Sequence, residues 1–167
     1  MASVRMMVVV SESAASERAL AYVARVLGGR RGVQVCLARA LPPVPPALLE
    51  FGGAENPREE IRREAELRAK RRAWRTAATN TVRRSLDGAR QTLRGGGVPP
   101  HRIRTHLFDP ADGRDTAEEI LCTARARHYR TVVVGRESAS RIRGFLSRDL
   151  AEELVHRAKG LTVWVVE

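Results

Sequence analysis

Short apolar segments alternate with helical patterns along the whole of this 167-residue chain. Near-continuous apolar runs occur at residues 5–10, 33–41, 131–135 and 161–166. Such runs are typical of strands covered on both faces of a parallel sheet. A fifth segment, 101–108, alternates in character and is expected at a sheet edge. Strand and helix in regular succession predict an α/β fold, an open doubly wound sheet of five parallel strands with helices on both faces.

Capping residues and apolar spacing predict three of the helices. The first runs from about Ser13, capped by Ser13 or Ser16, to a stop at Gly28 and Gly29. Another is capped by Asp115 and runs through Arg127. For a third helix, capped by Ser147, the residues expected to face the core are Leu150, Leu154, Val155 and Ala158.

The chain is expected to form a single domain, residues 1–167, with a loop at 42–57 and a long basic helical region at 58–94. At 1.5 Å per residue this helix would reach about 55 Å, more than the width of such a domain. Its first turns are therefore expected to kink or project, with a break near Thr79 and Thr81. The apolar stripe of the helix consists of Leu67, Trp74, Ala78, Val82, Leu86, Ala89 and Leu93.

The net charge of +11 suggests a polyanionic partner. Almost all of the positive charge is arginine, since only Lys70 and Lys159 are lysines. Aromatic residues make up only 4% of the chain, too few to form a stacking platform for single strands. Nucleic-acid binding through the basic helix is therefore kept as a lesser alternative to a solvated face with pairs such as Glu59–Arg63.

The two cysteines, Cys36 and Cys122, are too few for a disulfide framework. Both lie in apolar segments, so two reduced, buried thiols in a cytoplasmic protein are expected. The first apolar run is shorter than the ~20 residues of a membrane span, and no membrane association is expected.

The predicted strand order is 3-2-1-4-5, which reverses between the first and fourth strands. Sheets of this kind bind ligands beyond the carboxyl ends of the strands at that point. The loops that meet there are SESAAS and GRESAS, residues 11–16 and 135–140. Gly135, with access to positive φ, and the serine N–H groups after it form a plausible anion cradle.

The chain resembles the universal stress protein family over nearly its full length. The likeness rests on MMVVVSES followed by a helix, a second strand that ends in a proline-rich loop, the long Arg/Glu helix, DTAEEIL, and VVVG followed by VWVV. Members that hold ATP typically carry an aspartate just after the first strand. They also carry a pattern of three glycines and a hydroxyl residue after the fourth strand, where the backbone and a helix N-terminus face the triphosphate.

Four of these five positions depart from the family pattern. Ser11 stands at the aspartate position, and only Gly135 matches the first glycine. Ser138, Arg148 and Asp149 take the places of the other two glycines and the hydroxyl residue. An ionised Asp149 about 4 Å from a phosphate would repel it by roughly 1–4 kcal/mol. ATP binding in the family's usual mode is therefore not expected.

The arginines and serines after the fourth strand leave two alternatives open. They could bind a different anion or a nucleotide in a shifted pose, or they could pair with Glu137 and Asp149 in a self-satisfied cluster. No cofactor is expected, with ATP or AMP as the alternative. The candidate binding residues are Ser11, Ser13, Gly135, Arg136, Ser138, Ser140, Arg148 and Asp149.

No catalytic constellation is visible in the sequence. The motifs GxxxxGK[ST], GxSxG and HExxH are absent. His101, His106, His128 and His156 fall in four separate segments, so no metal site is expected. We therefore expect a non-enzymatic stress-response or regulatory protein. The main alternative is a sensor of adenine nucleotides or other anions.

The last strand is apolar although it lies at a predicted sheet edge, where an uncovered strand invites pairing. The resemblance implies a homodimer in which this strand pairs with its copy, and no other protein partner is indicated. Trp164 could instead pack on the final helix. The expected interface is Leu161, Thr162, Val163, Trp164, Val165 and Val166.

Overall fold

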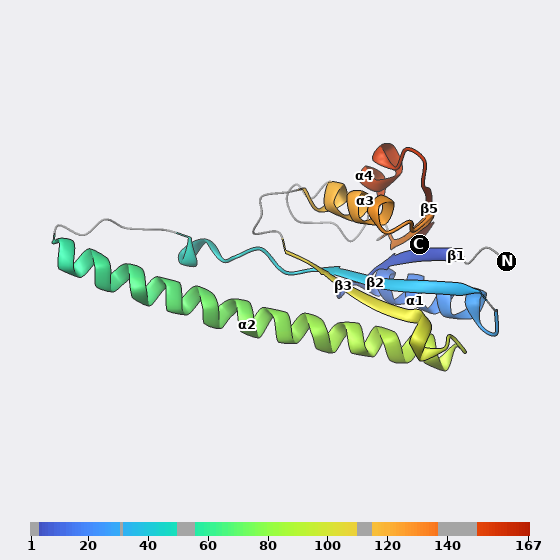
Figure 1. Ribbon diagram of the computed structural model, residues 1–167, viewed down its shortest axis with the longest axis horizontal. Helices are drawn as coiled ribbons and strands as arrows, with labels where there is room; N and C mark the ends of the chain where they lie inside the picture. Colours follow the sequence, from blue (N-terminus) through green and yellow to red (C-terminus); the bar gives the residue numbers. More distant parts are fainter. Residues whose placement is uncertain (1–3, 31, 50–55, 110–114, 137–149) are drawn as a thin grey trace.

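The structure is a computed structural model that describes residues 4–30, 32–49, 56–109, 115–136 and 150–167. Its core is a five-stranded sheet in the order β3-β2-β1-β4-β5, in which every pairing is parallel. The fold class and strand order predicted from the sequence are thereby confirmed (Figure 1). The strands are β1 (Val4–Val9), β2 (Val33–Ala40), β3 (Ile103–Phe108), β4 (Thr131–Gly135) and β5 (Thr162–Val166).

Helices cover both faces of the sheet because successive strand residues point to opposite sides. Met6 and Val8 of β1 pack with α1 (Ala14–Leu27) and α2 (Pro57–Gly95). Met7 and Val9 pack with α3 (Thr116–Ala126) and α4 (Leu150–Arg157). The sheet is therefore the middle of three layers (Figure 1).

The start of α1 follows the prediction. Ser13 is the N-cap, in an extended conformation, and its hydroxyl accepts the N–H of Ser16. The face of α1 that packs on the sheet is buried at Ala15, Ala19, Val23 and Leu27.

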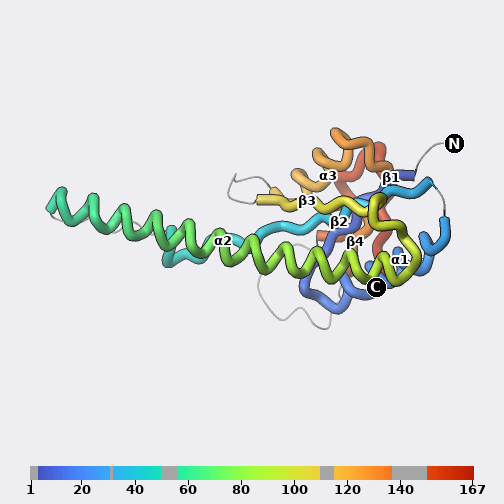
Figure 2. Tube along the Cα trace, turned by 60° about the horizontal axis from the view of Figure 1, so that its bottom comes forward, coloured from blue at the N-terminus to red at the C-terminus, as the bar shows by residue number. Residues whose placement is uncertain are grey.

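The helix α2 is continuous over 39 residues. At 1.5 Å per residue it is about 58 Å long, and its N-terminal part extends far beyond the sheet (Figures 1 and 2). The predicted projection is confirmed, but the predicted break near Thr79 and Thr81 is wrong. Each of these residues costs a helix well under 1 kcal/mol relative to alanine, too little to interrupt it.

The predicted loop at 42–57 contains a short 3-10 helix, η1 (Pro46–Leu48), and its last residue, Pro57, already belongs to α2. A second 3-10 helix, η2 (Pro100–Arg102), leads into β3. Within the described parts of the chain, no helix is long and apolar enough to cross a membrane.

Two burial predictions are wrong. Val155 of α4 is 53% exposed because the core face of this short helix is formed by Ala151 and Leu154. Cys122 is exposed and only Cys36 is buried. Cys122 lies one residue beyond the buried pair Ile120 and Leu121, so its side chain is turned away from the sheet.

The strand β5 forms one edge of the sheet. Its Trp164 packs on the α1 side, where its ring meets that of Tyr22 edge-to-face at 6.1 Å between centroids. The alternative that Trp164 packs on the final helix is therefore wrong. Leu161 and Val163, on the opposite side, pack with the core beneath α3 and α4.

Candidate functional site

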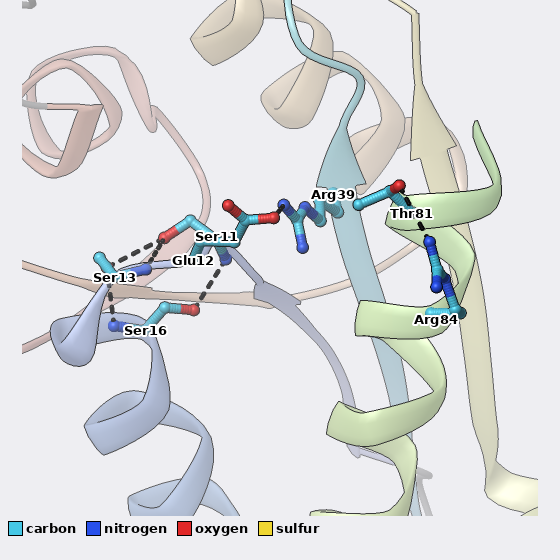
Figure 3. Close-up of polar contacts among 7 residues, drawn as sticks. All are labelled: Ser11, Glu12, Ser13, Ser16, Arg39, Thr81 and Arg84. Carbon is cyan, nitrogen blue, oxygen red and sulfur yellow. Dashed lines mark hydrogen bonds and ion pairs between the residues drawn. The ribbon is translucent and has the colours of Figure 1, made fainter. Parts of the chain in front are cut away.

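Three serines close the turn between β1 and α1. The N–H of Ser11 donates to Oγ of Ser16 at 2.8 Å, and the hydroxyls of Ser11 and Ser13 lie 3.0 Å apart (Figure 3). Oγ of Ser13 accepts the N–H of Ser16 at 3.1 Å. Part of the hydrogen-bonding capacity at the start of α1 is thus used within the chain.

Gly135, the last residue of β4, faces the first turn of α1. A β-carbon at this position would overlap the carbonyl group of Ala15 and lie 2.6 Å from the backbone nitrogen of Ser16. Gly135 does not adopt the positive φ expected from the sequence; the described glycines that do so are Gly29, Gly32, Gly97 and Gly160. Glycine is required here by close backbone packing of α1 on β4, not by a turn.

An ion pair joins the ends of β1 and β2. Nη2 of Arg39, near the end of β2, donates to Oε1 of Glu12 at 2.6 Å (Figure 3). The side chain of Arg39 is 11% exposed, whereas that of Glu12 is 72% exposed. A largely solvated carboxylate therefore pairs with a nearly buried guanidinium.

The second terminal nitrogen of Arg39, Nη1, is buried and has no hydrogen-bond partner among the residues that the structure describes. A buried donor without a partner costs about 1–3 kcal/mol. Such a group calls for a structural or functional explanation.

Ser11, Glu12 and Arg39 line a cleft of about 480 Å³ at the carboxyl ends of β1 and β2. Its volume is within the range of small-molecule sites. The described residues along it are mainly apolar, and its walls include Trp74, Phe108 and Leu150. The polar residues among them are Ser11, Glu12, Arg39, Thr81 and Thr116. A ligand suited to it would have an apolar or aromatic body and a hydrogen-bond acceptor.

The comparisons with known proteins agree with this arrangement of strands. The model of the universal stress protein family matches residues 4–167. The chain belongs to the universal stress protein family. No curated protein matches the sequence closely enough to add to this assignment.

Solved universal stress proteins share the fold at low sequence identity. One from Archaeoglobus fulgidus, in complex with dAMP, has 20% identity and a TM-score of 0.57, with 100% of each chain covered. A universal stress protein in complex with cAMP has 16% identity and a TM-score of 0.62, with 100% of this chain and 98% of that chain covered. A family member from Burkholderia pseudomallei has 17% identity and a TM-score of 0.60, with 98% and 95% covered.

The structure brings together some of the candidate residues and leaves others outside its described part. Ser11, Ser13 and Gly135 meet where β1, β4 and the start of α1 come together. Arg136 donates its backbone N–H to Val166 at 2.8 Å, and its Nη1 lies 3.8 Å from Oε1 of Glu167. The remaining candidates, Ser138, Ser140, Arg148 and Asp149, with the predicted cap Ser147, lie outside the described residues.

Sequence reasoning missed Glu12 and Arg39. Both carried a signal, because Glu12 directly follows Ser11 at a strand end and Arg39 is the only charged residue in an apolar strand. Trp74 was assigned only to the apolar stripe of α2, although it also lines the cleft.

Within the described ranges, no group of three or more His, Cys, Asp or Glu side chains could hold a metal ion. Burial raises the pKa of the Cys36 thiol, which therefore stays protonated, and also raises the pKa of Tyr129 beside it. Burial and the nearby positive charge of Arg127 lower the pKa of His106, so its imidazole is neutral at physiological pH.

Proposed function

We propose that this universal stress protein is a non-enzymatic stress-response or regulatory protein that does not bind ATP in the family's usual mode. The observation that carries the proposal is Ser11. Its position corresponds to the aspartate of the ATP-holding members, and its hydroxyl lies 3.0 Å from that of Ser13. A neutral hydroxyl with a partner inside the chain replaces a carboxylate that would accept from ligand hydroxyls.

Charge at the same strand end supports the proposal. Glu12 places a carboxylate at the cleft, and Arg39 is its partner. Asp149, at the position of the family's hydroxyl residue, adds a second negative charge in the sequence. Carboxylates near a triphosphate weaken its binding unless cations offset them. Arg39 offsets Glu12, so the repulsion of a triphosphate would come from Asp149.

The second candidate function is a sensor of adenine nucleotides or other anions. It is supported by the cleft of about 480 Å³, by the unpartnered Nη1 of Arg39, and by two similar proteins that were solved with dAMP and cAMP. A ligand of this class would lay its ring against Trp74 and direct an acceptor to Arg39. It would not need the family's triphosphate loop.

Isothermal titration calorimetry with ATP, AMP and cAMP separates the two candidates. The first predicts no micromolar binding of ATP by the native protein, and micromolar ATP binding would overturn it. The second predicts binding of AMP or cAMP that is lost in Arg39→Gln and kept in the matched surface variant Arg18→Gln. Gly135→Val is unsuited as a binding variant because its side chain would collide with Ala15.

Pairing of β5 with its copy remains part of the proposal. The strand lies at a sheet edge, and Val165 is 37% exposed. A homodimer through residues 161–166 would cover this edge. A cytoplasmic location is also part of the proposal, and the two unpaired cysteines are in keeping with it. Light scattering on the native protein is expected to give twice the mass of one chain; the mass of a single chain at micromolar concentration would contradict the dimer.

A further inference from the structure

The N-terminal part of α2, residues 57–81, is here called the arm. It contains no buried residue, and burial in α2 begins at Val82. At 1.5 Å per residue the arm is about 38 Å long, and it extends away from the sheet (Figures 1 and 2). Most of its surface is therefore exposed, whereas the rest of the helix buries one face.

The arm is basic even after its internal ion pairs are counted. It carries eight cationic and four acidic residues, a net charge of +4. The acids Glu59, Glu64 and Glu66 pair with Arg63, Arg68 and Arg62. At the base of the arm, Arg71 donates to the carbonyl of Leu48 and Arg75 pairs with Asp109.

Five arginines of α2 are exposed and form no ion pair with any residue that the structure describes: Arg58, Arg72, Arg83, Arg84 and Arg94. Arg84 donates a hydrogen bond to the hydroxyl of Thr81. The other four are here called the arginine row. Arg72, Arg83 and Arg94 are spaced by 11 residues, close to three helical turns, so they lie on one face of the helix. Arg58 lies within about 40° of the same line, and a single acid, Asp87, flanks the row.

The spacing of the arginine row matches a duplex. Eleven residues of α-helix rise about 16.5 Å. A turn of B-DNA is about 34 Å long and carries two strands, so a line parallel to its axis meets a phosphate backbone about every 17 Å on average. Because the major and minor grooves differ in width, the successive distances between phosphate backbones are unequal. Arginine side chains are long enough to reach phosphates on either side of these average positions.

We propose that the arginine row and the arm bind the phosphate backbone of double-stranded DNA, without sequence specificity, with α2 lying along the duplex. Guanidinium groups are well suited to phosphate oxygens. The only aromatic residue of α2 is Trp74, which lines the cleft, so the arm offers no stacking platform for the bases of a single strand. No arginine of the row is among the described residues that line the cleft, and the interaction does not depend on the function proposed for the cleft.

Fluorescence anisotropy with a labelled duplex of about 24 base pairs tests the proposal in salt between about 50 and 200 mM. The wild type is expected to bind with a log–log salt slope of about −3.6 or steeper, as for four or more phosphate contacts. Replacing the four arginines of the row by glutamine is expected to weaken binding at least about tenfold at low salt and to make the slope shallower by about 3.6.

The matched control replaces four exposed cations of the body, Arg18, Arg30, Arg130 and Lys159, by glutamine. It removes the same charge and is expected to change the affinity by less than about threefold. A variant with the row changed to lysine is expected to bind like the wild type, which separates loss of charge from loss of helix. Circular dichroism checks that each variant keeps its helix content.

Three results would overturn the proposal. One is equal weakening in the row variant and the body control, which would assign the binding to bulk charge. Another is duplex RNA binding as tightly as duplex DNA. The third is displacement of the DNA by polyglutamate at equal charge, which would assign the arm to acidic proteins.

Discussion

The two parts of α2 share one continuous helix but differ in what surrounds them. The body part, residues 82–95, buries Val82, Leu86, Ala89 and Leu93 against α1 and the sheet. The arm, residues 57–81, buries none of its residues. The comparison shows that an unbroken helix can be part of the core at one end and a free charged surface at the other.

Different interactions keep the two parts helical. The body part is held by apolar packing, which supplies most helical stability in proteins. The arm is stabilised mainly by interactions between residues close in the sequence. Asn56 caps it by accepting the N–H of Arg58, Pro57 occupies its first turn, and Glu59 and Arg63 pair at 2.5 Å. Because it continues a helix already formed in the body, the arm does not need its own nucleation step.

Truncation of one apolar side chain in each part gives the largest expected contrast. Leu93 is fully buried, so Leu93→Ala is expected to lower the free energy of unfolding by about 2–5 kcal/mol. Ile61 of the arm is 68% exposed, so Ile61→Ala is expected to change it by less than about 0.5 kcal/mol. Urea unfolding measures both. A comparable loss in Ile61→Ala would show that the arm is covered in the native protein.

Ion pairs give the second contrast. Asp115 caps α3 and pairs with Arg157 of α4 at 2.6 Å, whereas Glu59 of the arm pairs with Arg63 of the same helix. Asp115→Ala is expected to cost about 1 kcal/mol of global stability, mainly through the lost cap. Glu59→Gln is expected to leave global unfolding unchanged, because its pair supports only the arm.

The stabilising charge of Asp115 also has a predictable pH dependence. The hydrogen bond from Arg157 holds the pKa of Asp115 below its ordinary value. Its contribution is therefore full above the unfolded-state pKa and is lost as the pH falls through the lower folded-state pKa. Asp115→Asn keeps a cap but not the charge. The free energy of unfolding of this variant is therefore expected to be lower than that of the wild type at pH 7 and to match it near pH ~2. An equal difference at both pH values would contradict the assignment.

Glycine substitution gives the smallest contrast. A β-carbon on Gly88, in the body part, would meet no atom within 4 Å. Gly88→Ala is therefore expected to raise the free energy of unfolding by about 0.5–1 kcal/mol. The reverse change in the arm, Ala69→Gly, is expected to lower helix content without shifting the urea midpoint, since the arm can fray independently. A shifted midpoint would mean that the arm unfolds with the core.

Local patterns predicted the framework of the molecule. Apolar runs and their spacing predicted the strands and the order β3-β2-β1-β4-β5. The serine before the first helix predicted the N-cap at Ser13. The length of the basic helix gave the projection of the arm. These features depend on neighbours in the sequence or on connection rules that apply to all α/β folds.

The features that the sequence did not predict depend on contacts between distant segments. The pair Glu12–Arg39 joins residues 27 apart, and the need for glycine at Gly135 comes from the backbone of Ala15. The expected break near Thr79 failed because weak propensities do not interrupt a helix that is stabilised on both sides. The exposure of Val155 follows from the shortness of α4, whose core face holds only two buried residues.

Hydrogen–deuterium exchange along α2 tests the central claim most directly, since it reports the opening of each backbone amide. Amides of residues 86–94 are predicted to exchange at least about a hundredfold more slowly than those of residues 60–72, both in the isolated protein. On addition of duplex DNA at low salt, the arm is predicted to gain more protection than the body part, whose amides are already protected by packing against the core. Equal protection of the two parts in the isolated protein would contradict the division of α2 into a packed body part and a free arm.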